Sequence, residues 1–433
     1  MTNLPGEHPL RRTLNDEVHA RPPEALMAPC RLSFLALEDA GGDRSVHQAP
    51  IVALCREFGV APPDARANHF SADFGTFRLK WEKHTEFTRY KFIVPSKGEA
   101  PFEVRAVDAV PEAWVSALPG RLIAGVHLEH LQAAREPLDL ERLSKRYFAG
   151  NVMIGASIAD GRAHAFTDFR IREDGFSRFM IFDASLAPRQ AGRSVQRLLE
   201  IDAYRILAMM ALPVARELGP HLSNAEAELV SITATLASED AQDEPKLLDR
   251  LTRLEAQIHQ RLFASAPRFS ASDAYYRLIR QRTDELREGR LEGVQTFREF
   301  IERRLSPAMS TCAATATRQE KLSQRVAETT QLFSTRVEVS RQRQSQDVLE
   351  SLNSRALLQL RLQQTVEGLS VAAITYYVVG LIAYLAKGIV YAGLPVSPEV
   401  LIAASVPIVA VLVALAVRRI RRHIAPGHAD GGG

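Results

Sequence analysis

The stretch that decides the fold lies near the end of the chain: LSVAAITYYVVGLIAYLAKGIVYAGL, residues 369–394, and VLIAASVPIVAVLVALAV, residues 400–417. The first segment has 26 residues and one charge, Lys387, and as a helix it would extend about 39 Å. The second has 18 residues and would extend about 27 Å. The first is long enough to cross a hydrocarbon core of about 30 Å with tilt, and the second just reaches across it. Because only the loop 395–399 separates them, the two segments predict a transmembrane hairpin.

Basic residues flank the hairpin on one side of the membrane only. They are Arg355 and Arg361 before the first span and Arg418, Arg419, Arg421 and Arg422 after the second. The connecting loop holds no Lys or Arg. Because cytoplasmic flanks carry an excess of Lys and Arg, both termini are predicted to be cytoplasmic. The alternative is a buried helix pair in a soluble protein, which is disfavoured because apolar runs this long beside an Arg cluster are unusual in soluble cores.

Composition and net charge limit the classes of function and the cellular compartment, but they do not identify an activity. The chain has 433 residues, and its 54 basic and 51 acidic residues give a net charge of +3, so nothing global indicates nucleic-acid binding. The start of the chain, residues 1–9, lacks the apolar core of a signal peptide, so we expect the N-terminus to stay in the cell. Cys30, Cys55 and Cys312 are far apart and form no CxxC pair. They are typical of buried thiols in a reducing compartment, and we expect no cofactor.

Residues 1–187 are predicted to form a sheet-centred α+β domain. Alternating apolar and polar residues at 77–82 and 88–94 indicate strands, residues 120–128 are a further strand candidate, and residues 51–58 indicate a short helix. A three-stranded meander is predicted over 152–159, 163–171 and 176–182, because Asp160-Gly161 and Asp174-Gly175 suit tight turns.

Residues 188–316 are predicted to be helical. One helix covers 190–218 with a kink at Pro213, and a capping box at Ser223–Glu226 begins another that ends near Leu236. Further helices are expected at 246–263, 272–288 and 291–305. Residues 317–367 contain no Pro or Gly and predict one stalk helix of about 75 Å. The hairpin, 368–417, and a basic tail, 418–433, complete the chain.

The sequence carries none of the common catalytic signatures. It has no GxxxxGK[ST], GxGxxG or HExxH motif. His127 and His130 could supply metal ligands, but on a strand they would face opposite sides of the sheet, so a structural role is favoured and the metal question stays open. These absences predict a protein without enzymatic activity.

Two groups of polar residues are candidate ligand sites. Asp16 and His19 would share one face of a short helix with Arg21 nearby, and the carboxylate could orient the imidazole for ligand binding or catalysis. The alternative is a polar helix that caps the sheet. The second group is a basic strand face of Arg78, Lys80, Lys83, His84, Arg89 and Lys91. It could bind anions or nucleotides, although Glu82 and Glu86 favour a solvated or partner-packed face.

Four of these segments carry a family resemblance: residues 14–22, 77–87, 174–179 and 190–200. With them, nearly the whole chain is similar to the bacterial membrane-anchored family called domain of unknown function 3422. The resemblance implies a multi-pass protein of the bacterial inner (cytoplasmic) membrane, and it implies no activity.

The order of a cytosolic α/β domain, a stalk helix, two spans and a basic tail also resembles the CorA magnesium channel family. That resemblance implies an oligomer that passes a divalent cation, with Thr375, Gly380, Lys387 and Tyr391 along the pore. The Gly-Met-Asn of that family is absent, since Tyr391-Ala392-Gly393-Leu394 stands in its place.

The interpretation that these observations favour is an oligomeric α+β cytosolic domain on a helical stalk, anchored in the lipid bilayer by a two-span hairpin. Its role would be that of a non-enzymatic scaffold or sensor. The alternatives are a divergent CorA-like cation channel and an enzyme or ligand site at Asp16, His19 and Arg21.

Overall fold

The structure is a computed structural model that describes residues 7–19, 23–39, 44–134, 138–237, 244–391 and 397–424. The chain forms two compact units, Met1–Thr330 and Gln331–Gly433. The first unit contains a sheet and the helices that cover it, and the second contains the long continuation of one helix and a C-terminal apolar helix.

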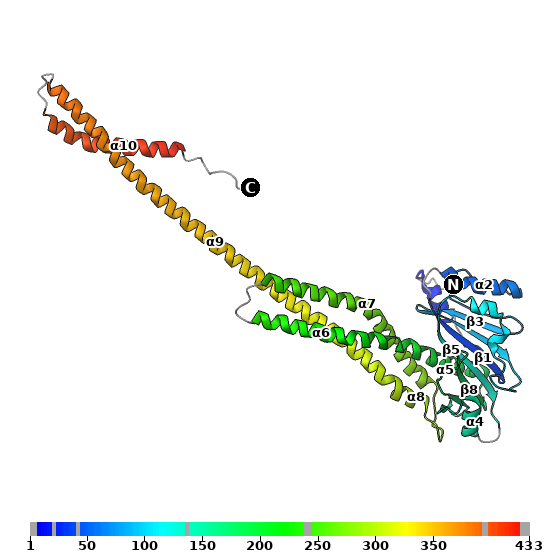
Figure 1. The fold of residues 1–433 in the computed structure, drawn as a ribbon. Helices are drawn as coiled ribbons and strands as arrows, with labels where there is room; N and C mark the ends of the chain where they lie inside the picture. The colour runs from blue at the N-terminus through cyan, green and yellow to red at the C-terminus, as the bar shows by residue number, and fades with distance from the viewer. Residues whose placement is uncertain are drawn as a thin grey trace. The chain divides into compact units, whose positions relative to one another are not determined.

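An eight-stranded sheet forms the centre of the first unit (Figure 1). Its strands are β1 (Cys30–Glu38), β2 (His69–Asp73), β3 (Arg78–Lys83), β4 (Phe87–Pro95), β5 (Leu122–Gln132), β6 (Ile154–Ile158), β7 (Ala163–Thr167) and β8 (Ser177–Asp183). The strand order is β2-β3-β4-β1-β5-β8-β7-β6. β5 and β8 pair in parallel, and the other neighbours are antiparallel.

The predicted strands are confirmed, including the β6-β7-β8 meander. β1 and β2 were not predicted. β1 lies between β4 and β5 near the middle of the sheet, and its sequence, CRLSFLALE, is buried on both faces. A strand buried on both faces lacks the alternation by which half-buried strands are recognised, and for that reason its sequence gives a weak signal.

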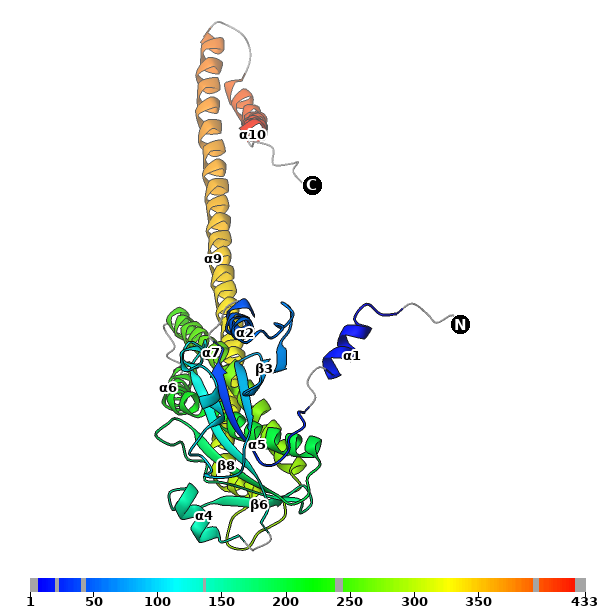
Figure 2. The ribbon, with the colours of Figure 1, turned by 90° about the vertical axis from the view of Figure 1, so that its right-hand side faces the viewer.

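Helices cover both faces of the sheet (Figure 2). One face packs against α5 (Pro188–Met209), whose Asp202 accepts a hydrogen bond from Ser177 of β8. The other face carries two apolar cores. The first lies under α2 (Arg44–Phe58), η1 (Ala106–Ala109) and α3 (Glu112–Ser116) and includes Trp81, Tyr90 and Phe92. The second lies beside α4 (Leu140–Tyr147) and includes Phe166 and Met180.

Three helices form a bundle behind α5: α6 (Ala211–Ala237), α7 (Glu244–Glu285) and the first part of α9 (Ser306–Tyr391) (Figure 1). Arg318 of α9 pairs with Glu226 of α6 at 2.5 Å, and Ser265 of α7 bonds to Gln319 of α9 at 2.9 Å. The predicted kink at Pro213 is displaced, because the chain turns at Met210 instead. Pro213 lies in the first turn of α6, where its missing N–H breaks no helical bond.

Three further helix predictions were wrong. The expected capping box at 223–226 lies inside α6, where the Ser223 hydroxyl donates to the Gly219 carbonyl. The helices expected at 246–263 and 272–288 are one helix, α7, which continues through Pro267. The helix expected at 291–305 is replaced by α8 (Phe297–Phe300) and a π-helical turn (Ile301–Leu305). A capping box, Thr296 with Glu299, does begin α8.

The second unit consists of the rest of α9 and α10 (Pro398–Ile424). The predicted continuous helix over 317–367 is confirmed, since α9 runs unbroken for 86 residues. Both helices are long and apolar enough to cross a membrane. Their most apolar windows have mean hydropathies of 1.9 and 2.9, and 6% of each window is buried. One more helix, α1 (Arg11–His19), precedes the sheet in the sequence.

Candidate functional site

The centre of the basic strand face, Lys80, Arg89 and Lys91, is buried under α5 together with Glu82 and is not open to solvent. Lys80, Glu82, Arg89 and Lys91 are each between 2% and 8% exposed. They share one face of the sheet because Lys80 pairs in register with Lys91, and Glu82 with Arg89. The alternating pattern of β3 indicated a half-buried strand, and that expectation was wrong: the charged side of the strand is as buried as the apolar side.

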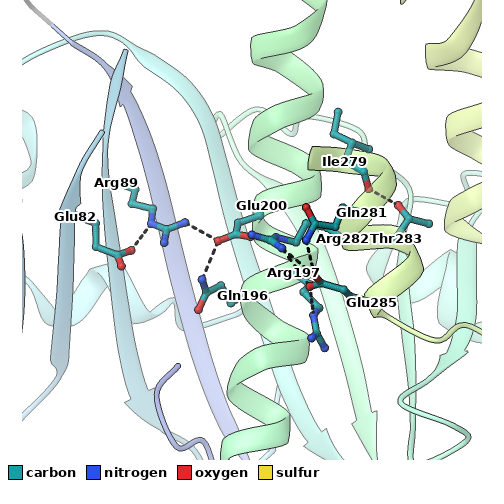
Figure 3. Close-up of polar contacts among 10 residues, drawn as sticks. All are labelled: Glu82, Arg89, Gln196, Arg197, Glu200, Ile279, Gln281, Arg282, Thr283 and Glu285. Carbon is teal, nitrogen blue, oxygen red and sulfur yellow. Dashed lines mark hydrogen bonds and ion pairs between the residues drawn. The ribbon is translucent and has the colours of Figure 1, made fainter. Parts of the chain in front are cut away.

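Ion pairs link this face to two helices (Figure 3). Arg89 of β4 pairs through Nε with Glu82 of β3 and through Nη1 with Glu200 of α5, at 3.0 Å from Oε1. The other oxygen of Glu200 lies 2.5 Å from Nε of Arg282 on α7. Gln196 also donates to Glu200, at 2.8 Å. One carboxylate therefore joins the sheet, α5 and α7.

Opposite charge governs the ionisation of this network. Burial alone would raise the pKa of Glu82, but the charges of Arg89, Lys80 and Lys91 outweigh it and lower that pKa to about 2. The pKa of Glu200 is lowered in the same way by Arg89 and Arg282, against the effect of burial. Both carboxylates are consequently ionised at neutral pH. Removing one partner would leave a buried charge without its counter-ion, which is the costly way to break such a pair.

The segment after α1 also contacts this face. The backbone N–H of Leu26 donates to the Pro188 carbonyl at 2.9 Å, which holds residues 23–27 across the start of α5. Glu24 accepts a hydrogen bond from Ser71 at 2.8 Å and pairs with Lys91 at 3.3 Å. A Cβ added at Gly192 would lie 1.7 Å from the Glu24 carbonyl oxygen. Only glycine fits at this crossing of two backbones.

The two histidines of β5 do lie on opposite faces, and each bonds to the β1 residue beside it in register. His130 Nδ1 lies 3.6 Å from the Cys30 sulfur, and its Nε2 lies 2.9 Å from Asp183. On the other face, His127 Nδ1 lies 2.9 Å from the Ser33 hydroxyl, and its Nε2 lies 3.7 Å from Asp174. A third chain of this kind joins Thr88, His47 and Asp39.

These three series of contacting side chains contain the residue types of catalytic triads, but their Cys, Ser and Thr side chains are not accessible to a substrate. Cys30, Ser33 and Thr88 are all buried. Burial, with the charges of Glu129 and Asp183, raises the pKa of Cys30 to about 12. The Ser33 oxygen already accepts the backbone N–H of Val107 at 3.0 Å. A nucleophile must be activated and must reach its substrate, so we assign a structural role to all three: two join neighbouring strands, and the third joins β4 to α2.

An open groove of about 950 Å³ lies beside the buried network. Its walls come from the start of α2, the loop before β2, the β3–β4 turn and one face each of α5 and α7. The lining residues are Arg44, Ser45, Gln48, Ala65, Asn68, Lys83, His84, Thr85, Phe87, Tyr204, Tyr275 and Leu278. Its lining contains both charged and aromatic side chains.

The predicted ligand residues do not converge on one place. Lys80 lies in the buried network, and His84 lies in the groove, stacked on Phe87 with 4.5 Å between ring centroids. Arg78 begins β3, its side chain is 43% exposed, and it lies 3.9 Å from Asp73. Asp16 is exposed on α1. The side chain of His19 and the whole of Arg21 lie outside the described residues, so that cluster stays a prediction.

The predicted pore residues lie in the second unit. Thr375 and Gly380 of α9 line an apolar groove beside Val406 and Ala410 of α10. Lys387 is exposed, and the side chain of Tyr391 is outside the described residues. A pore through these spans therefore stays a prediction. Over the described ranges, no group of three or more His, Cys, Asp or Glu side chains could hold a metal ion.

The residues that sequence reasoning missed are Glu200 and Arg282 in the network and Arg44, Tyr204 and Tyr275 in the groove. One signal was present for the network. Glu200 and Asp202 interrupt an apolar run, Leu198–Ala203, in the middle of α5. Charges on the buried side of a helix require buried counter-charges, and those are available on the basic strand face.

The comparisons with known proteins agree with the resemblance carried by residues 14–22, 77–87, 174–179 and 190–200. No curated protein matches the chain. The family model described as "Protein of unknown function (DUF3422)" matches residues 6–424. The match covers the sheet, the bundle, the long helix and α10, and so the chain belongs to the DUF3422 family.

Proposed function

We propose that the chain is a non-enzymatic sensor or scaffold that α9 and α10 anchor in the bacterial inner membrane. The observation that carries this proposal is the exposure of two apolar helices. Leu381 and Leu385 of α9 and Leu412 and Leu415 of α10 are each more than half exposed. Exposing two such apolar faces to water is energetically unfavourable, whereas in the hydrocarbon core of a membrane they contact lipid.

The contact between the two helices supports a hairpin. Ala386 of α9 and Ser405 and Val409 of α10 are buried side chains in the described part of the two apolar helices. Small residues let helix backbones approach closely, which is how helices associate in lipid. The arginines in the last turns of α10 and those before the first span favour cytoplasmic termini, with loop 395–399 on the outer side.

An exposed apolar stripe along the stalk part of α9 supports the proposal that the protein is an oligomer. At about 100° per residue, a single sector of about 120° holds Phe333, Val337, Val348, Leu352, Leu358, Leu362, Val366 and Leu369. From Val348 onward, the members of this stripe are more than half exposed. A long helix gains most of its stability by burying such a stripe. A second copy of the chain is the partner we propose, and membrane anchoring makes the two helices parallel. Residues 340–347 are wholly polar, so the contact would have two parts.

The first test of this proposal is fractionation. Full-length protein expressed in bacteria should remain in the membrane pellet after extraction at alkaline pH, which releases peripheral proteins. A variant with Leu381→Lys, Ile382→Lys, Leu412→Lys and Val413→Lys should move to the supernatant, because each charge at a span centre costs about 2.5–3.5 kcal/mol. A matched control places lysine at Arg336, Arg341, Arg343 and Arg355 of the stalk. Release of the wild-type protein would refute the anchor.

A further inference from the structure

We propose that the groove of the first unit binds a small anion that carries a planar ring, of the chemical class of a nucleoside monophosphate. This proposal deepens the sensor role by naming the class of ligand. The volume of about 950 Å³ lies within the range of pockets that hold cofactor-sized ligands, which is about 300–1,000 Å³.

One wall of the groove is cationic. Arg44 and Lys83 are among its lining residues, and no Asp or Glu is among them. Two acidic side chains near this lining are paired: Asp39 lies 2.9 Å from Lys83 Nζ and 2.6 Å from His47 Nε2, and Glu86 of the β3–β4 turn lies 3.2 Å from Arg268. Burial would raise the pKa of Asp39, but Lys83 and His47 lower it, so this carboxylate is ionised and bonded. Ser45 stands beside Arg44 in the first turn of α2, where backbone N–H groups also favour an anion.

Aromatic side chains form another part of the lining. Tyr204 of α5 and Tyr275 of α7 stack with 5.5 Å between ring centroids, and Phe87 meets both of them edge-on, at 6.3 and 6.4 Å. His84 adds a second flat surface on the β3–β4 turn. Aromatic side chains favour planar rings in offset-stacked or edge-on contact. The groove therefore combines side chains that suit a planar ring with side chains that suit a phosphate.

Hydrogen bonds hold the groove in shape. Gln48 donates to the carbonyls of Asp64 and Ala67, at 3.1 and 2.8 Å, and Arg44 Nη1 donates to the Arg66 carbonyl at 2.8 Å. On the other side, Arg268 of α7 pairs with Glu86 of the β3–β4 turn at 3.2 Å. A preformed site loses little conformational entropy when it binds a ligand.

The position of the groove suits a sensor. Tyr204 lies one helical turn after Glu200, and Tyr275 lies two turns before Arg282, on the same helices that the ion-pair network ties to the sheet. A ligand that touches α2, the β3–β4 turn, α5 and α7 together would change how firmly the sheet holds the helices.

The test uses the full-length protein in detergent with three probes: AMP, adenosine and inorganic phosphate. Isothermal titration should give saturable binding of AMP, with adenosine and phosphate each at least about tenfold weaker. Arg44→Ala should weaken AMP binding at least about tenfold, because a hydrogen bond to a charged group is lost. Thr85→Trp, on the exposed turn, should block the groove and abolish binding. The matched control is Arg56→Ala, which removes an exposed arginine from the last turn of the same helix.

Three results would overturn the proposal. They are the absence of saturable AMP binding to wild-type protein, equal affinities in Arg44→Ala and Arg56→Ala, and phosphate binding as tight as that of AMP. Far-UV circular dichroism of each variant shows whether the fold is retained. Membrane anchoring is measured separately by fractionation, so a groove that binds nothing leaves the anchor intact, and a released protein leaves the binding result intact.

Discussion

Glu200→Gln is the variant that probes the buried network most directly. Glu200 accepts from Arg89 at 3.0 Å, from Arg282 at 2.5 Å and from Gln196 at 2.8 Å, and its side chain is 4% exposed. The amide has nearly the same shape but no charge, and its NH₂ group would face one of the two guanidinium groups. Breaking a buried pair by removing one partner costs about 3–5 kcal/mol. We expect the lower end, about 3 kcal/mol, because the amide oxygen still accepts one bond.

The assay is urea unfolding followed by tryptophan fluorescence. Of the two tryptophans of the chain, Trp81 lies in the apolar core under α2 and Trp114 of α3 packs against that core, so their signal reports the sheet-containing unit. With a slope of about 3 kcal/mol per M, the midpoint should fall by about 1 M.

The control variant is Glu141→Gln. It removes an exposed pair with Lys145, whose side chains are 78% and 71% exposed, and should cost less than about 0.5 kcal/mol. If the midpoint of Glu200→Gln stays as close to wild type as that of Glu141→Gln, the network does not hold α5 and α7 to the sheet.

Three further predictions concern other parts of the chain. Gly192→Ala should destabilise the sheet-containing unit by more than about 2 kcal/mol in the same assay, because its Cβ would meet the Glu24 carbonyl oxygen at 1.7 Å; Gly219→Ala, which meets nothing within 4 Å, is its control. Burial lowers the pKa of His127 from 6.5 to about 4 in the folded protein. The stability that depends on the neutral imidazole is therefore complete above pH 6.5, and up to about 3 kcal/mol of it is lost as the pH falls to 4. In His127→Gln, the free energy of unfolding should depend less on pH over that window. Val337→Pro should remove a helical hydrogen bond and destabilise α9 by about 3 kcal/mol, seen as a loss of helical circular dichroism, and wild-type stability would show that the stalk is not a rigid helix.

The fold could be predicted where one physical rule decided the local structure. Alternation located β3 and β4, Asp-Gly turns located β7 and β8, and the absence of Pro and Gly over 317–367 located the long helix. The predictions failed where tertiary packing overrode a local signal. Pro267 did not end α7, and β1, buried on both faces, had no alternation.

The site was predictable only in part. The basic residues of β3 and β4 were identified, but sequence alone could not tell that Glu200, more than a hundred residues further along the chain, neutralises Arg89 and pairs in turn with Arg282. The groove could not be predicted from the sequence, because Arg44, His84, Tyr204 and Tyr275 come from four separate segments. No spacing rule connects residues that only the packing of α2, α5 and α7 brings together.

The most direct test of the membrane anchor is a topology measurement on the full chain. A reporter that is active only outside the cytoplasm, and one that is active only inside, would be fused in turn at Met1, within loop 395–399 and after Arg422. The account predicts inside, outside and inside, because the basic flanks stay in the cytoplasm. An outside signal at either terminus, or an inside signal from the loop, would contradict the two-span hairpin.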